Sequence, residues 1–97
     1  MAAKLTAAAR TAALRKLPQW KLNEAGTAIS RTYTFADFSE AFGFMTRAAL
    51  FAESLNHHPD WSNSYKKVSV TLSTHEAGGL SKLDLTLAAA MDAIAGI

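Results

Sequence analysis

The feature that most constrains the fold is a long segment, from Phe35 to Leu55, that contains no proline and a single glycine. Its apolar residues recur at steps of three and four, which is the spacing of one face of an α-helix. Thr34 followed by Asp37 has the form of a helix N-cap signal, so we expect a long helix that begins near Phe35.

This helix carries more apolar residues than one face can hold. One stripe consists of Phe38, Phe42, Met45, Ala49 and Ala52, and a second stripe beside it consists of Phe44, Ala48, Phe51 and Leu55. One face of a small sheet cannot cover both stripes. The extra stripe is buried either against another subunit or under the terminal helices, and the pattern alone favours neither alternative.

Segments on both sides of the helix alternate between apolar and polar residues, as half-buried β-strands do. Before the helix, residues 20–22 and 29–33 flank a turn at Asn-Glu-Ala-Gly and predict one hairpin. After it, a short strand that follows His-His-Pro and the alternating residues 68–72 predict a second hairpin.

The two ends of the chain have helical patterns. Residues 5–17 are rich in Ala and Leu and are followed by Pro18, which cannot continue a helix. Ser81 and Asp84 repeat the capping spacing ahead of an apolar pattern that runs to Ile94. The predicted order is therefore α-ββ-α-ββ-α, an α+β fold in which helices pack on one face of a four-stranded antiparallel sheet. We expect residues 1–97 to form a single domain.

Composition narrows the functional classes. The formal charge is +2, and Lys and Arg are scattered along the chain, which is too weak a signal for direct binding of nucleic acid. The lack of cysteine excludes a disulfide framework, a thiolate metal site and a cysteine nucleophile, and it suits a reducing compartment such as the cytoplasm. No apolar run approaches the roughly 20 residues of a membrane span.

All three histidines, His57, His58 and His75, lie at the entry and exit of the second predicted hairpin. Imidazole has an ordinary pKa of about 6.5, so histidines brought together there suit general acid–base catalysis near neutral pH. A rival interpretation is a zinc or other divalent metal site that also uses Glu76, Asp60 or Asp84. A third is that the histidines are turn residues without a chemical role.

Asp84 and two aromatic residues also have alternative interpretations. Asp84 could be the acid of a capping box, or a carboxylate that fixes the tautomer of His75 and supports its charged form. Trp61 and Tyr65 could stack on a flat ring or pack in the core.

Taken together, His57-His58-Pro59, Tyr65, His75 and Asp84 resemble the signature of the pterin-4a-carbinolamine dehydratase family, or 4a-hydroxytetrahydrobiopterin dehydratases. The resemblance extends through Trp20-Lys21-Leu22 and Thr74-His75-Glu76 and covers roughly residues 17 to 95. It implies an α+β subunit that assembles as a homodimer or homotetramer through helices.

The resemblance also implies an activity. The substrate would be a 4a-hydroxytetrahydropterin released by aromatic amino acid hydroxylases, the product would be the quinonoid dihydropterin, and no metal or organic cofactor would be needed. The implied catalytic residues are His57, His58, His75 and Asp84, and the implied substrate-binding residues are Pro59, Trp61, Thr74, Glu76 and Ala77. In this hypothesis His57 and His75 act on the hydroxyl and the ring proton, His58 assists, and Asp84 supports His75.

A second function of another class stays open. Some animal members of the family are similar to dimerisation cofactors that bind a homeodomain transcription factor. That role would use the exposed stripe of the long helix and would add the nucleus to the expected locations.

Overall fold

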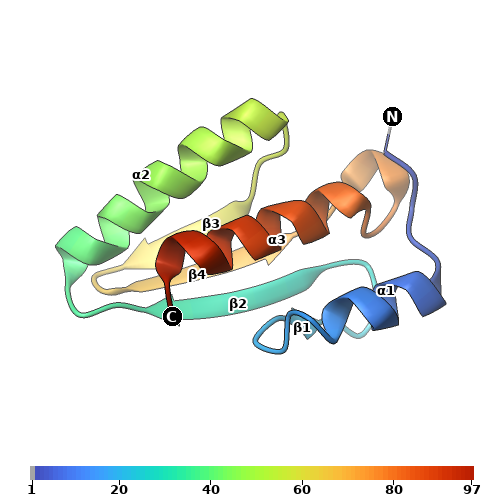
Figure 1. The fold of residues 1–97 in the computed structure, drawn as a ribbon, viewed down its shortest axis with the longest axis horizontal. Helices are drawn as coiled ribbons and strands as arrows, with labels where there is room; N and C mark the ends of the chain where they lie inside the picture. Colours follow the sequence, from blue (N-terminus) through green and yellow to red (C-terminus); the bar gives the residue numbers. More distant parts are fainter. Residues whose placement is uncertain (1) are drawn as a thin grey trace.

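The computed structural model describes residues 2–97 and contains the predicted order of elements. The elements are α1 (Ala7–Leu14), β1 (Lys21–Leu22), β2 (Ile29–Thr34), α2 (Phe38–Leu55), β3 (Asp60–Ser64), β4 (Lys67–Leu72), the short 3₁₀ helix η1 (His75–Ala77) and α3 (Lys82–Ala95). The strands form one antiparallel sheet in the order β1-β2-β4-β3. Helices α2 and α3 lie side by side over this sheet (Figure 1), so the predicted α+β fold is confirmed.

The sheet has one buried and one exposed face. In β4, Val68, Val70 and Leu72 are buried beneath the helices, whereas the residues between them are exposed. This alternation follows from the period of two in a strand, which sends successive side chains to opposite faces. The core centres on Tyr33 and Phe44, whose ring centroids lie 4.7 Å apart.

Helix α2 begins three residues later than the sequence pattern suggested. The N-cap is Asp37, not Thr34: the Asp37 side chain accepts a hydrogen bond of 2.9 Å from the backbone N–H of Glu40. Thr34 is instead the last residue of β2 and pairs with Lys67. The capping spacing was misread because sequence alone does not show where the preceding strand ends.

The two apolar stripes of α2 have different environments. Phe44 and Ala48 of the second stripe are buried in the core, whereas Phe38 and Phe42 of the first stripe are 47% and 57% exposed. Leu50 extends the exposed side and is 69% exposed. The terminal helices therefore leave the side of α2 that carries Phe38, Phe42 and Leu50 open.

The terminal helices differ slightly from their predicted ranges. Helix α1 is shorter than the pattern of residues 5–17: Thr6 caps its start, and it ends at Leu14. Helix α3 has the predicted capping box, formed by Ser81 and Asp84. None of the helices in the described part of the chain is long and apolar enough to cross a membrane.

One end of the sheet gathers the segments that carry the predicted site. In Figure 1 the end of α2, the start of β3, the end of β4 and the start of α3 are the right-hand ends of their elements. The pairing of Asp60 with Thr71 fixes this arrangement, because it places the residues before β3 beside the residues after β4.

Candidate active site

His57 lies in the connection between α2 and β3 and is 8% exposed. Asn56 ends α2 in the left-handed conformation, and the backbone N–H of His57 still donates to the carbonyl of Ala52. This turn directs the imidazole toward the start of α3, where its Nε2 atom lies 2.6 Å from Oδ1 of Asp84. The pair is buried, since Asp84 is fully shielded from solvent.

The Asp84 carboxylate has three hydrogen-bond partners at once. Its Oδ2 atom accepts hydrogen bonds from the backbone N–H of Ser81 at 3.0 Å and from the hydroxyl of Thr74 at 2.7 Å, while Oδ1 faces His57. The capping-box interpretation is therefore confirmed, and the same carboxylate also contacts a histidine. The expected partner was wrong, however: the carboxylate bonds to His57 and not to His75.

His58 points elsewhere. Its Nε2 atom lies 2.8 Å from Oε1 of Glu53, and both side chains are exposed, at 57% and 79%. His58 is therefore exposed although the neighbouring His57 is buried. The two neighbouring histidines thus have different surroundings.

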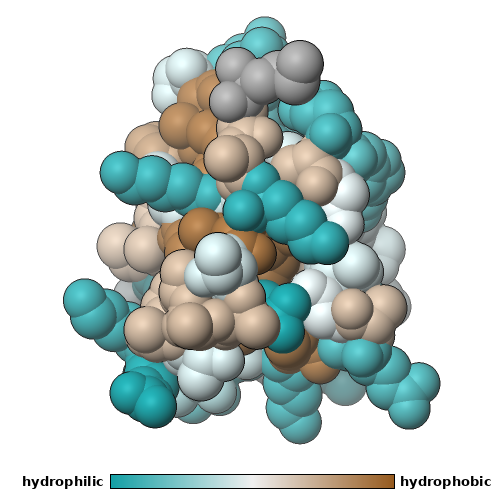
Figure 2. All heavy atoms as spheres, turned by 90° about the vertical axis from the view of Figure 1, so that its right-hand side faces the viewer, coloured by the Kyte–Doolittle hydropathy of each residue, from teal (hydrophilic) through white to brown (hydrophobic). Residues whose placement is uncertain are grey.

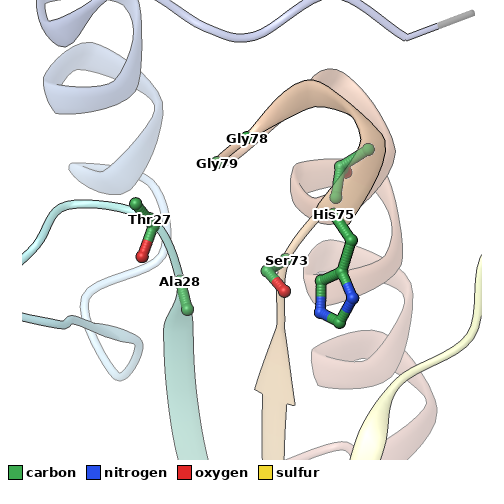
Figure 3. A pocket seen from close by; sticks show the side chains of 7 residues that line it. Thr27, Ala28, Ser73, His75, Gly78 and Gly79 are labelled. Carbon is green, nitrogen blue, oxygen red and sulfur yellow. The ribbon is translucent and has the colours of Figure 1, made fainter.

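His75 is exposed and lines a pocket of about 320 Å³. The lining residues are Thr27, Ala28, Ser73, Thr74, His75, Gly78 and Gly79. In Figure 3 the His75 side chain extends from η1 past Ser73, on the side of the β4 end away from Thr27 and Ala28. The volume is at the lower end of the range of small-molecule sites.

The backbone of the loop after β4 shapes this pocket. Gly78 ends η1 with a φ of 74°, a conformation that favours glycine. Gly79 pairs with Thr74 across the base of the loop, where the backbone N–H of Thr74 donates to the Gly79 carbonyl at 2.9 Å. Figure 2 shows this end of the molecule, where hydrophilic side chains cross exposed hydrophobic ones.

The predicted substrate-binding residues are not all equally close to the pocket. Thr74 lines it, whereas Glu76 and Ala77 lie in η1 and are not among its lining residues. Pro59 is half-buried in the segment after His58, and the half-buried Trp61 on β3 packs partly against the core. Thr74 connects the pocket with the buried pair, because its hydroxyl contacts Asp84.

Tyr65 occupies a different part of the molecule. It lies in the turn between β3 and β4 with a φ of 54° and is 64% exposed. This turn is at the opposite end of the hairpin from His57 and His75, so Tyr65 cannot stack on a ring held in the pocket.

Several pocket residues were missed by the sequence analysis, namely Thr27, Ala28, Ser73, Gly78 and Gly79. The two glycines could have been identified from the sequence, because they are adjacent in a polar loop. Thr27 and Ala28 could not: they reach the pocket only because Ile29 of β2 pairs with Leu72 of β4.

Two other features were considered as sites. A larger hollow of about 410 Å³ is lined by Gln19, Lys21, Ser30, Arg31 and Thr32, none of which is a histidine or a carboxylate. Within residues 2–97, no three His, Cys, Asp or Glu side chains are grouped so that they could hold a metal ion. The metal interpretation thus finds no ligand set there.

A second polar network lies away from the pocket. The side chains of Arg31, Tyr33 and Trp20 all donate hydrogen bonds to Oδ1 of Asp92 on α3. Burial of the phenol, followed by its hydrogen bond to Asp92, raises the pKa of Tyr33 well above its ordinary value. This network ties α3 to the sheet.

Known families and curated proteins include sequences similar to this chain. A profile of the family described as pterin 4 alpha carbinolamine dehydratase matches residues 3–94. A protein of Bradyrhizobium sp. (strain BTAi1) named pterin-4-alpha-carbinolamine dehydratase is 60% identical over 95 residues, which make up 98% of this chain and 96% of the relative.

Two solved structures are also similar. The crystal structure of a transcriptional coactivator/pterin dehydratase from Brucella melitensis is 49% identical, with a TM-score of 0.92 over 96% of this chain and 99% of that chain. A pterin dehydratase-like protein, described as a RuBisCO assembly factor in the alpha-carboxysome, is 22% identical, with a TM-score of 0.70 over 80% and 90% of the two chains. At that identity the second likeness extends to the fold alone.

Proposed function

The chain belongs to the pterin-4-alpha-carbinolamine dehydratase family, and we propose that its histidine site removes water from a 4a-hydroxytetrahydropterin to give the quinonoid dihydropterin. The chain is accordingly a hydro-lyase. The observation that carries the residue assignment is the buried pair of His57 and Asp84, which Thr74 connects to the pocket lined by His75.

The dehydration makes two demands on the site. The bond between C4a and its hydroxyl breaks and the proton on N5 leaves, so that a C4a=N5 double bond forms and water departs. One group must protonate the leaving hydroxyl while another accepts the N5 proton. His57 and His75 divide these steps, because imidazole can donate or accept a proton near neutral pH. The net proton count of the site is unchanged, since the acid loses one proton and the base gains one.

The other two members of the catalytic set act through these histidines. Asp84 supports His57, whose ring nitrogen it contacts. His58 assists by position: its contact with Glu53 on α2 holds the segment that carries His57.

The pterin ring binds beside η1, at the end of the sheet that holds His57 and His75. Thr74, Glu76 and Ala77 offer backbone groups to its amide-like edge, Pro59 stiffens the segment after the histidines, and Trp61 contributes a wall. These side chains and peptide groups supply the chemistry without a metal or an organic cofactor. The reaction recycles the pterin cofactor of aromatic amino acid hydroxylases in the cytoplasm.

Stopped-flow absorbance tests this assignment. Chemically prepared 4a-hydroxytetrahydropterin is mixed with the protein in the presence of a chelator, and the rate of dehydration is compared with the rate without protein. We expect acceleration that survives chelation and disappears in the His57→Ala, His75→Ala double variant. Ser62→Ala, an exposed change on β3, is the matched control and should retain full activity. A double variant with normal turnover, or activity lost only on chelation, would overturn the assignment.

Self-association through α2 completes the proposal. Phe38 and Phe42 contact each other at a centroid distance of 5.7 Å on the exposed side of this helix, and Leu50 lies further along the same side. An apolar stripe of this kind is suited to burial against a second copy of the chain, as a dimer or a tetramer. Sedimentation analysis should therefore give an oligomer, and Phe42→Lys should shift it toward the monomer. Thr86→Lys, an exposed change on α3, should leave the oligomer intact. A wild-type monomer would refute this part of the proposal.

A second candidate function uses the same helix face. The Brucella melitensis relative is described as a transcriptional coactivator as well as a pterin dehydratase, and the exposed stripe of α2 could bind a homeodomain transcription factor in place of a second copy. The two functions separate in one experiment. Loss of dehydration in His57→Ala with unchanged partner binding, and the reverse in Phe42→Lys, would establish both.

A further inference from the structure

The side-chain hydroxyl of Thr74 makes its hydrogen bonds to other protein side chains, although the residue also lines the pocket. Thr74 is 1% exposed, and its Oγ1 atom lies 2.7 Å from Oδ2 of Asp84 and 2.6 Å from Oγ of Ser81. A carboxylate can only accept, so the single hydroxyl proton of Thr74 goes to Asp84. Ser81 must then donate its own hydroxyl proton to Thr74.

These directions define a chain of hydrogen bonds that ends at a histidine. The backbone N–H of Leu83 donates to the Ser81 hydroxyl, and the chain continues through Thr74 to Oδ2 of Asp84. The backbone N–H of Ser81 adds a second donor to the same oxygen. Bonds of this kind to a charged acceptor are among the stronger ones in proteins, so Oδ2 is held in place and Oδ1 is left facing His57.

The remaining oxygen decides the tautomer of His57. Oδ1 lies 2.6 Å from Nε2, and an ionised carboxylate requires a donor, so neutral His57 carries its proton on Nε2. Its other ring nitrogen, Nδ1, is then an acceptor. Nδ1 of His57 has no hydrogen-bond partner among residues 2–97. Arg10 Nε is the only fully buried side-chain polar atom of these residues that lacks a partner. Nδ1 is therefore not fully buried and is in contact with solvent.

We propose that Thr74 is a positioning residue: its hydroxyl fixes Asp84, and through Asp84 it keeps the proton of His57 on Nε2 and the open Nδ1 ready to accept a proton. The catalytic part of this inference rests on the proposed dehydration. The tautomer itself does not, because the hydrogen bonds that set it are present without substrate.

Thr74→Val and Thr74→Ser separate this role from a merely structural one. Valine keeps the shape and removes the hydroxyl, whereas serine keeps the hydroxyl and removes the methyl group. The backbone bonds between Thr74 and Gly79 remain in both variants. Thr71→Val, an exposed change on β4, is the matched control.

The first readout is the nitrogen NMR spectrum of histidine-labelled protein without substrate, in which His57→Ala identifies the His57 signals. We expect a single tautomer protonated on Nε2 in the wild type, in Thr74→Ser and in Thr71→Val, and a mixture of tautomers in Thr74→Val. The second readout is steady-state dehydration. Thr74→Val should lower kcat by about 10- to 100-fold, the range seen when the outer hydrogen-bond partners of metal-bound histidines are removed, with little change in KM. Thr74→Ser should restore most of it.

The outcomes distinguish the two levels of the proposal. A wild-type tautomer and kcat in a well-folded Thr74→Val, or equal damage in Thr74→Val and Thr74→Ser, would overturn the role of the hydroxyl. A shifted tautomer in a protein that does not accelerate dehydration would keep that role and refute the proposed function instead.

Discussion

Asp92→Ala is expected to destabilise the fold more than a typical surface substitution. Oδ1 of Asp92 accepts from Arg31 Nη1 at 2.7 Å, from Trp20 Nε1 at 3.0 Å and from the Tyr33 hydroxyl. Alanine leaves all three donors without this acceptor, and the Arg31 side chain is only 11% exposed. The network joins α3 to the sheet, so its loss acts on the packing of the whole helical layer.

The magnitude follows from the burial of the pair. Removing one partner of a buried ion pair costs about 3–5 kcal/mol, because the other charge is left uncompensated. The Asp92 side chain is 24% exposed and Arg31 also donates to the carbonyl of Ile97, so water and the chain end can solvate part of the released charge. We therefore expect a loss near the lower end, about 3 kcal/mol in the free energy of unfolding.

Urea unfolding followed by tryptophan fluorescence measures this loss. Trp20 is buried beside Asp92 and should report the transition. At about 4–8 °C per kcal/mol, Tm should fall by at least about 12 °C. Asp60→Ala, an exposed change on β3, should cost less than about 0.5 kcal/mol. A loss below about 1 kcal/mol in Asp92→Ala would refute the reasoning, since it would mean that the three donors find equally good partners elsewhere.

Three further predictions test other parts of the structure. Burial and the neighbouring carboxylate raise the pKa of Tyr33 above its ordinary value of 10.0, so the stability that this shift contributes is complete below pH 10 and declines as pH rises beyond it. Between pH 9 and pH 11 the free energy of unfolding should therefore fall more steeply in the wild type than in Tyr33→Phe, by up to about 1.4 kcal/mol per pH unit. Parallel curves for the two proteins would contradict this. Asp37→Ala removes the cap of α2 and should cost about 1 kcal/mol in urea unfolding, whereas no loss would mean that the helix start is held by packing alone. Asp84→Asn can present an amide N–H to His57 and reverse its tautomer, so kcat in the stopped-flow assay should fall at least about 100-fold without loss of fold, and an active variant would remove Asp84 from the catalytic set.

Local periodicity predicted the order of elements correctly. A period of two or of 3.6 residues is a property of each segment by itself, so the strands and helices could be read without knowing what they contact. Boundaries were less certain where two elements adjoin. Thr34 and Asp37 both fit a cap, and only the pairing of Thr34 with Lys67 in the sheet decides between them.

The candidate site was likewise predictable from the sequence only in part. The clustering of His57, His58 and His75 around one hairpin is visible in the sequence, and the register of β3 and β4 brings their segments to one end of the sheet. The surroundings of the three histidines are not visible there. His57 is buried on a carboxylate, while His58 is exposed beside Glu53.

By itself the sequence determined the family, the α-ββ-α-ββ-α order and the set of residues able to carry acid–base chemistry. The tertiary structure decided which of them meet: Asp84 contacts His57 and not His75, Tyr65 lies at the far end of the hairpin, and Ala28 joins the pocket from the segment before β2. The physical reason is that spacing along the chain fixes the direction of a side chain within its own element. Which residue of another element that side chain contacts depends on how the elements pack, and that packing is set by the whole core.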